Sequence, residues 1–310
     1  MSNKNKKIVF FGTPDFSLPP LKTLYLGGYE IVGIYTQEPK KKSRGMKMIK
    51  TPVHDWAETQ LLPVFTPKLI DNNSLEEFRN LKPDIAILFA FGKIIPQSWL
   101  DIPLFGFINI HASLLPAWRG AAPVQRAIEN NDSKTGITIM KMNHKLDEGP
   151  ILKTKEIEIK SSMNGKDLID IISIESCSLL YQVLKDYFKG LIPLLEQDVT
   201  QASYANKIKK QECEINWSLP SYAINQKIKA FFPYPSMWFN FEGKRYKVLK
   251  AKIRDDEGEP GTIINNELTI ACGEGSIQIE EIQVEGKPKS DAKEFLFGYK
   301  NFCIGKKIIA

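Results

Sequence analysis

Short apolar runs alternate with helical patterns through the first half of the chain. Apolar runs bounded by turn residues predict strands at residues 7–12, 30–36, 63–65, 84–91, 107–111, 136–142 and 151–159. Apolar positions at helical spacing predict helices at residues 16–26, 53–60, 75–81, 97–100, 122–130 and 166–189. Strands that alternate with helices predict a Rossmann-like α/β domain, with a mostly parallel sheet covered on both faces. Such sheets bind ligands at the carboxyl ends of their strands, so polar residues that follow strands are expected to meet there.

The pattern changes after Gly190. Residues 191–205 show no clear period, which is typical of a linker. From Ile208 onward, short extended runs are separated by turn signals such as Glu242-Gly243 and Asn265-Asn266. Closely spaced strands of this kind predict a small OB-like β-barrel. The expected organisation is therefore an α/β domain at 1–190, a linker at 191–207 and a β-barrel domain at 208–310.

The composition is that of an ordinary globular protein. Of the 310 residues, 43% are hydrophobic and 25% are charged, which is enough for a sizeable core and two domains. The four cysteines contain no Cys-x-x-Cys pair and only three histidines are present, so no metal site is expected and a reduced, cytoplasmic protein fits best. The apolar run after the basic start spans only Ile8–Phe11, too short for a signal peptide, and no segment approaches a membrane span.

Three polar side chains associated with strands are candidates for catalysis. Asn109 and His111 lie at alternate positions of one predicted strand, so they project to the same side, and Asp147 follows a later strand. An amine that attacks an acyl carbon needs hydrogen-bond donors for the developing oxyanion, which the Asn109 amide and a protonated His111 would supply. It also needs a group that receives the amine proton, and Asp147 is the candidate for that role.

Basic residues are concentrated in two stretches. Residues 207–254 contain eleven Lys or Arg against three acidic residues, and residues 38–50 contain six against one. Aromatic residues such as Phe231, Tyr234 and Trp238 lie among the basic residues of the first stretch, a mixture that suits a phosphate backbone. A lysine-rich, solvated surface explains the same pattern equally well, so both interpretations stay open.

The chain also lacks one common nucleotide motif. The turn after the first predicted strand reads Gly12-Thr13-Pro14-Asp15, without the glycine pattern Gly-x-Gly-x-x-Gly that brings the backbone close to a pyrophosphate. A nicotinamide-dependent oxidoreductase is therefore disfavoured.

Several segments together resemble one enzyme family. The run Asn109-x-His111-x-Ser113-Leu114-Leu115-Pro116 with the later Asp147 resembles the signature of the formyltetrahydrofolate-dependent formyltransferases. Further segments resemble the members of that family that act on methionyl-tRNA: Phe11–Phe16, Tyr35-Thr36-Gln37, Trp118–Arg126, Thr135–Met140 and Ile215-Asn216-Trp217-Ser218. The resemblance extends over essentially the whole chain, so it predicts a formyltransferase domain followed by the β-barrel domain.

The resemblance implies a function and a set of site residues. It implies transfer of the formyl group of 10-formyltetrahydrofolate to the methionine amino group of initiator methionyl-tRNA, without a metal, by a protein that we expect to be a monomer. It implies that Asn109, His111 and Asp147 are catalytic. The folate site would comprise Ser113, Leu114, Leu115, Pro116, Phe89, Phe91 and Gly92. The tRNA would be bound by Lys40, Lys41, Lys42, Arg44, Lys47, Lys207 and Lys209.

One segment departs from the family pattern, and two other functions remain open. The family commonly carries Pro-Asp-Arg-Pro before the arginine that matches Arg44, whereas this chain reads Glu38-Pro39-Lys40-Lys41-Lys42. The first alternative function is formylation of a small amine, such as glycinamide ribonucleotide or an amino-sugar nucleotide. The second is a noncatalytic tRNA-binding protein. The basic region beyond Gly190 argues against the first, and the intact Asn109, His111 and Asp147 argue against the second.

Overall fold

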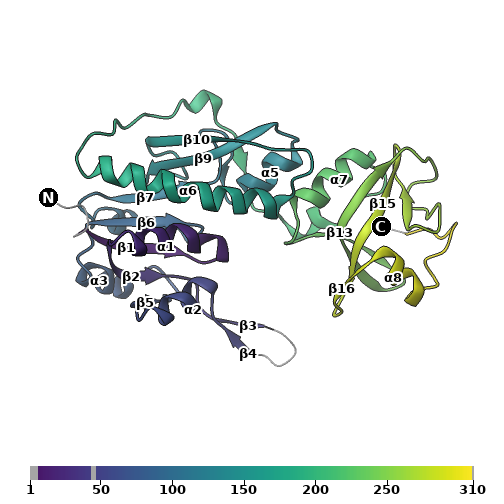
Figure 1. Ribbon diagram of the computed structural model, residues 1–310, viewed down its shortest axis with the longest axis horizontal. Helices are drawn as coiled ribbons and strands as arrows, with labels where there is room; N and C mark the ends of the chain where they lie inside the picture. The colour runs from purple at the N-terminus through teal and green to yellow at the C-terminus, as the bar shows by residue number, and fades with distance from the viewer. Residues whose placement is uncertain (1–5, 43–46, 309–310) are drawn as a thin grey trace. The chain divides into compact units, whose positions relative to one another are not determined.

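The computed structural model describes residues 6–42 and 47–308, which form two compact units (Figure 1). The first unit is formed by the chain up to Pro123 together with Lys134–Glu158 and Ile169–Ala205. The second is formed by Val124–Ser133, Ile159–Leu168 and the chain from Asn206 onward. Among the described residues, no helix is both long enough and apolar enough to span a bilayer.

A seven-stranded sheet forms the centre of the first unit. Its strands are β1 (Lys7–Gly12), β2 (Glu30–Tyr35), β5 (Val64–Phe65), β6 (Ile85–Phe89), β7 (Phe107–His111), β9 (Lys134–Lys141) and β10 (Ile151–Glu158). Their order is β10-β9-β7-β6-β1-β2-β5, so the chain moves outward from β1 on one side and then resumes with β6 on the other. The pairings among β5, β2, β1, β6 and β7 are parallel, and only those of β9 are antiparallel. The predicted mostly parallel α/β fold is confirmed.

Helices cover the sheet at the places that the sequence pattern predicts. They are α1 (Leu18–Leu26), α2 (Pro52–Thr59), α3 (Asn72–Asn80), α4 (Gln97–Leu100) and α6 (Gly165–Tyr187), whereas the predicted helix α5 (Pro123–Glu129) falls almost entirely in the second unit. Helix α3 begins three residues earlier than the apolar pattern suggests, because the Asp71 carboxylate accepts a hydrogen bond from the Ser74 N–H at 3.0 Å and caps the first turn. Strand β6 ends at Phe89, two residues early, because Ala90 adopts a left-handed conformation with φ 54°.

Aromatic packing fixes one face of the sheet. Phe11 of β1 stacks on Tyr35 of β2 at 4.7 Å, and both rings contact Phe78 of α3 and Trp99 of α4. The Phe78 and Trp99 rings themselves stack at 4.7 Å. In front of the sheet in Figure 1, α6 lies beside α1, and the Ser173 hydroxyl of α6 donates to the Phe16 carbonyl at 2.7 Å. Both faces are therefore covered, as the sequence pattern predicts.

Residues 191–205 pack against the first unit, although their sequence resembles a linker. Leu195 forms a two-bond antiparallel bridge with Ile151, the first residue of β10. The short strand β11 (Tyr204–Ala205) pairs in parallel with β8 (Arg119–Gly120). This segment has no apolar period because it is held by backbone hydrogen bonds rather than by one buried face. The domain limits at residues 190 and 208 stay a prediction.

The second unit contains a small antiparallel sheet. Its elements are η4 (Lys210–Cys213), α7 (Ser221–Ala230), β12 (Met237–Phe241), β13 (Lys244–Arg254), β14 (Thr269–Ala271), β15 (Ser276–Val284), β16 (Lys289–Asp291) and α8 (Ala292–Gly298). The order is β12-β13-β15-β14, with β16 also paired to β15. Glu242 and Gly243, both at positive φ, form the tight turn between β12 and β13, as their sequence predicts. The small β domain expected after the linker is confirmed.

Two leucines of α1 provide a matched test of this packing. Leu24 is fully buried, whereas Leu26, two residues later on the same helix, is 82% exposed. We expect Leu24→Ala to lower the free energy of unfolding by about 2–5 kcal/mol, because it removes buried methyl groups and leaves a cavity. Leu26→Ala is the control and should change it by less than about 0.5 kcal/mol. Thermal and denaturant unfolding of the two variants would measure the difference, and equal effects would contradict the packing described here for α1.

Candidate active site

Strand β7 carries two buried polar side chains on one face. Asn109 and His111 are 7% and 5% exposed, and they alternate with the apolar residues Ile108 and Ile110. Burying an amide and an imidazole without partners is costly, so each of these side chains needs hydrogen bonds inside the protein. Polar partners for Asn109 and His111 are therefore needed on this side of the sheet.

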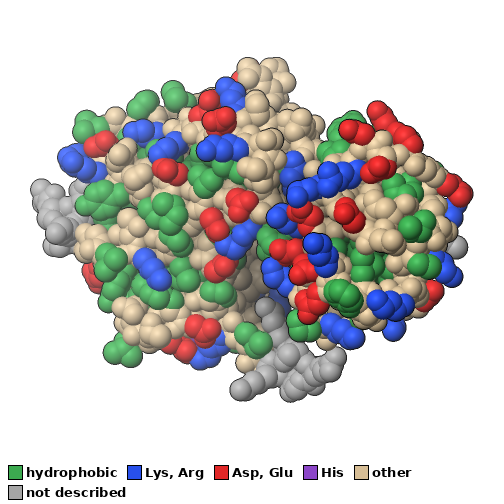
Figure 2. Space-filling view, turned by 45° about the vertical axis from the view of Figure 1, so that its right-hand side comes forward, with side chains coloured by type: hydrophobic (Ala, Val, Ile, Leu, Met, Phe, Trp, Pro, Cys, Tyr) green, Lys and Arg blue, Asp and Glu red, His purple; other side chains and the backbone are tan. Residues whose placement is uncertain are grey.

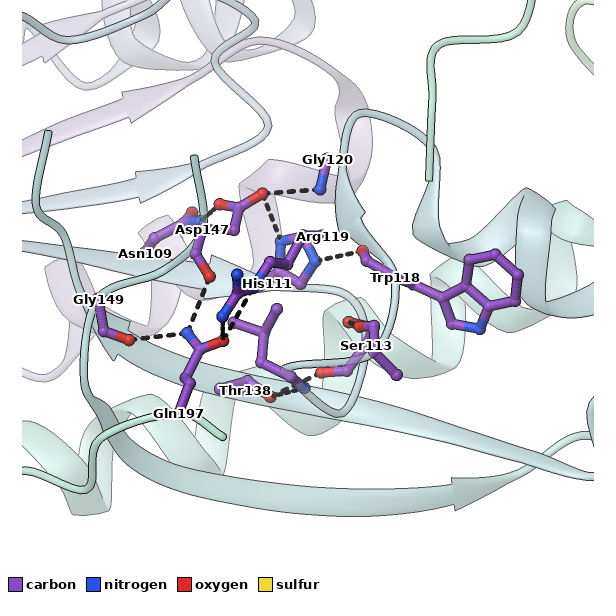
Figure 3. Close-up of polar contacts among 12 residues, drawn as sticks. Asn109, His111, Ser113, Trp118, Arg119, Gly120, Thr138, Asp147, Gly149 and Gln197 are labelled. Atoms are coloured by element: carbon purple, nitrogen blue, oxygen red, sulfur yellow. Dashed lines mark hydrogen bonds and ion pairs between the residues drawn. The ribbon is translucent and has the colours of Figure 1, made fainter. Parts of the chain in front are cut away.

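Asp147, in the loop between β9 and β10, is a polar partner of both side chains. Its carboxylate accepts a hydrogen bond from the Asn109 amide at 3.3 Å and from the Gly120 backbone N–H at 2.9 Å. The second carboxylate oxygen also lies 3.6 Å from His111 Nδ1 (Figure 3). The three predicted catalytic side chains thus converge on one point, while Asp147 keeps 14% of its side-chain surface exposed.

The route by which Asp147 arrives differs from the sequence expectation. Strand β9 runs antiparallel to β7, with Lys141 paired to Ile108, so the following loop starts beside the amino end of β7 rather than at its carboxyl end. The loop then folds back over the face of β7 to reach Asn109 and His111. Asn109, His111 and Asp147 therefore lie together because this loop turns back, not because they follow the carboxyl ends of parallel strands.

The imidazole of His111 is held at both nitrogens. Nε2 lies 2.9 Å from the Trp118 carbonyl oxygen, which can only accept, so Nε2 carries the hydrogen in this contact. Nδ1 faces the Asp147 carboxylate. A role for His111 as a donor to a substrate oxygen therefore requires one of these two contacts to be exchanged, whereas the Asn109 amide has a second hydrogen beyond the one given to Asp147.

The loop after β7 is fixed by hydroxyl groups. The Ser113 hydroxyl donates to the Ala117 carbonyl at 2.6 Å, and the Thr138 hydroxyl donates to the Ser113 carbonyl at 2.7 Å. The Leu115 N–H in turn donates to the Thr138 hydroxyl at 3.0 Å. Among the residues predicted to bind folate, Ser113 and Leu115 are buried and shape this loop, whereas Leu114 and Pro116 are half-buried.

The rings of Phe89 and Phe91, at the end of β6 and just after it, are buried in the core. The Phe89 ring packs against Phe16 at 5.4 Å, and the Phe91 ring packs against Phe11 at 5.2 Å inside the core. The Phe91 carbonyl accepts hydrogen bonds from Thr13 and Gln37, and Gly92 follows at φ 79°. Any contact of this segment with a ligand would therefore come from its main chain.

The basic residues predicted to bind tRNA fall in both units. Lys40 and Lys41 are exposed on the hairpin of β3 (Lys40–Lys42) and β4 (Lys47–Ile49), and Lys207 and Lys209 are exposed in the second unit. Arg44 and the side chains of Lys42 and Lys47 lie outside the described residues. Basic side chains of the second unit are interspersed with acidic ones on the surface (Figure 2).

Two side chains beside the site carry no sequence signal for their role. Arg119 is only 1% exposed and forms an ion pair with Glu148, and Gln197 reaches the same loop from the segment after Gly190 (Figure 3). An arginine is usually expected at the surface, and Gln197 belongs to a stretch without a period. Only the tertiary structure shows that both touch the Asp147 loop.

Three of the four cysteines are poor candidates for a second reactive centre. Burial raises the pKa of the Cys272 thiol to about 12, and burial also raises the pKa of Cys177 and Cys213. A thiol is reactive as the thiolate, so these residues are poor nucleophiles. Within residues 6–42 and 47–308, no group of three or more His, Cys, Asp or Glu side chains is arranged to hold a metal ion.

Comparison with known proteins defines the class to which this fold and site belong. The family model described as formyl transferase matches residues 6–184, and the model of the formyl transferase C-terminal domain matches residues 207–300. The chain therefore belongs to the formyl transferase family.

Curated relatives match over nearly the full chain. A protein of Pelagibacter ubique named methionyl-tRNA formyltransferase is 44% identical, covering 94% of this chain and 96% of its own length. A protein of Bradyrhizobium diazoefficiens with the same name is 40% identical, with 94% and 96% covered. The crystal structure of HypX from Aquifex aeolicus in complex with tetrahydrofolic acid shares the fold with a TM-score of 0.65 and 15% identity, over 93% of this chain and 46% of that one.

Thr138 allows a test of the loop after β7. Thr138→Val keeps the shape of the side chain but removes the hydroxyl, so the buried Leu115 N–H and Ser113 carbonyl lose their partner. We expect a loss of about 1–3 kcal/mol in the free energy of unfolding, because unsatisfied buried groups pay their full desolvation cost. Thr138→Ser retains the hydroxyl and should lose clearly less. If both variants unfold alike in calorimetry, the hydroxyl does not hold this loop.

Proposed function

We propose that this chain transfers the formyl group of 10-formyltetrahydrofolate to the α-amino group of methionine on initiator methionyl-tRNA. The observation that carries the proposal is the convergence of Asn109, His111 and Asp147 in a chain that belongs to the formyl transferase family. The relatives named methionyl-tRNA formyltransferase, at 44% and 40% identity over 94% of the chain, support the choice of acceptor.

The reaction forms one C–N bond and breaks another. The methionine nitrogen bonds to the formyl carbon, the bond from that carbon to N10 of the folate breaks, and one proton moves from the amine to the leaving nitrogen. Asp147 is placed to receive the amine proton, directly or through a water molecule. The free hydrogen of the Asn109 amide is placed to donate to the formyl oxygen as negative charge develops there. His111, between Asp147 and the Trp118 carbonyl, holds the carboxylate in place, and Asp147 then passes the proton to the leaving nitrogen, directly or through a water molecule.

The residues around this point fit a folate. The loop after β7 presents the half-buried apolar side chains of Leu114 and Pro116, and Ser113 and Leu115 hold its shape from inside. Main-chain groups at Phe89, Phe91 and Gly92 would complete the site for a flat, hydrogen-bonding ring. The structural neighbour described in complex with tetrahydrofolic acid has the same fold, which is consistent with this assignment.

The acceptor is assigned to the basic residues of both units. Lys40, Lys41, Lys42, Arg44 and Lys47 would approach the phosphates of the acceptor end, and Lys207 and Lys209 would contact the tRNA from the second unit. In this proposal residues 1–190 carry catalysis and residues 208–310 bind tRNA. We further place the protein in the cytoplasm, where charged initiator tRNA is used, and expect a monomer.

The direct test offers the purified protein three acceptors in parallel with 10-formyltetrahydrofolate. Formylation of methionyl-tRNA, detected as formylmethionine after deacylation, is the expected result. Turnover only with glycinamide ribonucleotide or an amino-sugar nucleotide would instead establish a small-amine formyltransferase. Binding of the tRNA without turnover of any acceptor would establish a noncatalytic tRNA-binding protein.

Asp147→Asn tests the assignment of the base. The amide is nearly isosteric with the carboxylate but accepts a proton poorly, so we expect kcat to fall by about 100-fold or more. Binding of 10-formyltetrahydrofolate, measured by fluorescence or calorimetry, should stay within about threefold, because the substitution leaves the apolar loop intact. A kcat within a fewfold of the parent would show that another group accepts the proton.

Lys40 and Lys41 test the contact with phosphate. Replacement of both by Gln removes two charges from the exposed hairpin, so the KM for tRNA should rise and the slope of log KM against log salt should fall by about 1–2. The matched control replaces Lys68 and Lys82, two exposed lysines elsewhere in the first unit, by Gln. An unchanged salt slope in the hairpin variant, or an equal change in the control, would argue against phosphate contact at this hairpin.

A further inference from the structure

The loop that carries Asp147 has an uncommon backbone conformation and runs close to a neighbouring strand. Asp147 adopts a left-handed backbone with φ 49°, a region that non-glycine residues rarely occupy. At Gly149 a Cβ atom would lie 1.8 Å from the Lys141 carbonyl oxygen, so the loop runs in close contact with the end of β9. Strained backbone of this kind persists only where surrounding groups hold it.

Gln197 is the side chain that holds this loop. Its Nε2 donates to the Asp147 carbonyl and to the Gly149 carbonyl, both at 2.8 Å, and so spans the loop on either side of Glu148 (Figure 3). One amide group therefore uses both of its hydrogens on the main chain of the loop.

Arg119 fixes the orientation of that amide. Its Nε and Nη2 donate to Gln197 Oε1 at 3.1 and 2.8 Å, and its Nη1 lies 3.3 Å from Glu148 Oε1. A guanidinium can only donate, so the oxygen of Gln197 must face Arg119 and the nitrogen must face the loop. Because Arg119 is 1% exposed and already has these partners, it is not available to bind phosphate.

The segment that carries Gln197 is itself anchored on both sides. Leu195 is bridged to Ile151, and β11 pairs with β8 so that Ala205 lies opposite Gly120. The Gly120 N–H is the group that donates to the Asp147 carboxylate. Residues 195–205 thus hold the backbone of Asp147 through Gln197 and support the β8 strand that fixes its carboxylate.

We propose that Gln197 is a positioning residue for the formyl transfer: it holds the Asp147–Gly149 loop so that the Asp147 carboxylate faces Asn109 and His111. The expected effect on formyl transfer rests on the proposed function. The expected effect on the position of the Asp147–Gly149 loop rests on the geometry alone. Gln197 touches no reacting atom and acts through Asp147.

The test uses Gln197→Glu in the full-length protein. The carboxylate keeps an oxygen for Arg119, so the fold is retained, but it places a second oxygen against the two loop carbonyls where Nε2 donated. We expect kcat for methionyl-tRNA formylation to fall by about 100-fold, since a displacement of about 1 Å at the reacting groups has that effect. The KM for 10-formyltetrahydrofolate should stay within about twofold, because the apolar loop is untouched. Gln201→Glu makes the same chemical change at an exposed position of the same segment and should leave kcat unchanged.

Two further measurements separate positioning from a general structural effect. In the Asp147→Asn background, Gln197→Glu should lower kcat by a further factor of less than about three. The effects of substitutions at residues that act through one another are not additive. In protein labelled with ¹⁵N-histidine, the ring resonances of His111 should move in Gln197→Glu, while those of His54 and His144 stay in place. His54→Gln and His144→Gln variants assign the three signals.

The outcomes are distinct. Unmoved His111 resonances, a parent-like kcat in Gln197→Glu, or full additivity with Asp147→Asn would each overturn the positioning role. If the His111 resonances move in Gln197→Glu but the parent protein formylates no methionyl-tRNA, the positioning role stands and the proposed acceptor is overturned.

Discussion

A carboxylate held by an amide, a backbone N–H and an imidazole is the interaction on which the site depends. Asn109 and His111 project from a strand that is otherwise apolar, and neither side chain can be buried there without partners. Asp147 supplies the shared acceptor, and the Gly120 N–H completes its coordination. These groups come from separate segments of the chain, so the site forms only when β7, β8 and the loop after β9 are assembled. The polar network therefore couples correct folding of β7, β8 and the β9–β10 loop to the geometry of the proposed catalytic residues.

Much of the fold could be predicted because it follows from periodicity. The apolar runs of β1 and β7 and the helical spacing of α6 each bury a regular set of positions, and such sets are visible in one sequence. The differences have local causes that periodicity does not encode. The Asp71 cap extends α3, and the left-handed Ala90 shortens β6. The antiparallel direction of β9 is set by pairing with β7, which no pattern within β9 reveals.

The grouping of Asn109, His111 and Asp147 could be predicted from the motif, but their support could not. Arg119 is a charged residue and is nevertheless buried, because Glu148 and Gln197 satisfy its guanidinium. Gln197 lies in a stretch without period, and its position depends on two backbone pairings that are far apart in sequence. Residues that contact a ligand are constrained in type by its chemistry, whereas residues that position them are constrained only by the space left between elements. The second constraint is visible only in three dimensions.

The acceptor, by contrast, cannot be specified by the three side chains proposed to be catalytic. An amide, an imidazole and a carboxylate treat any primary amine alike, so discrimination among acceptors must come from charge and shape elsewhere in the chain. Not all of the basic residues in the second unit are available to bind phosphate. Lys250 and Lys252 both pair with Glu280, and Arg126 pairs with Glu129 and Glu212. On β12 and β13 the Arg245 guanidinium instead lies over the Trp238 ring at 4.1 Å, a cation with an aromatic face of the kind that nucleic acids contact. The solvated-surface interpretation therefore accounts for the paired lysines, and the nucleic-acid interpretation rests on the exposed hairpin, Lys207, Lys209 and the arginine stacked on Trp238.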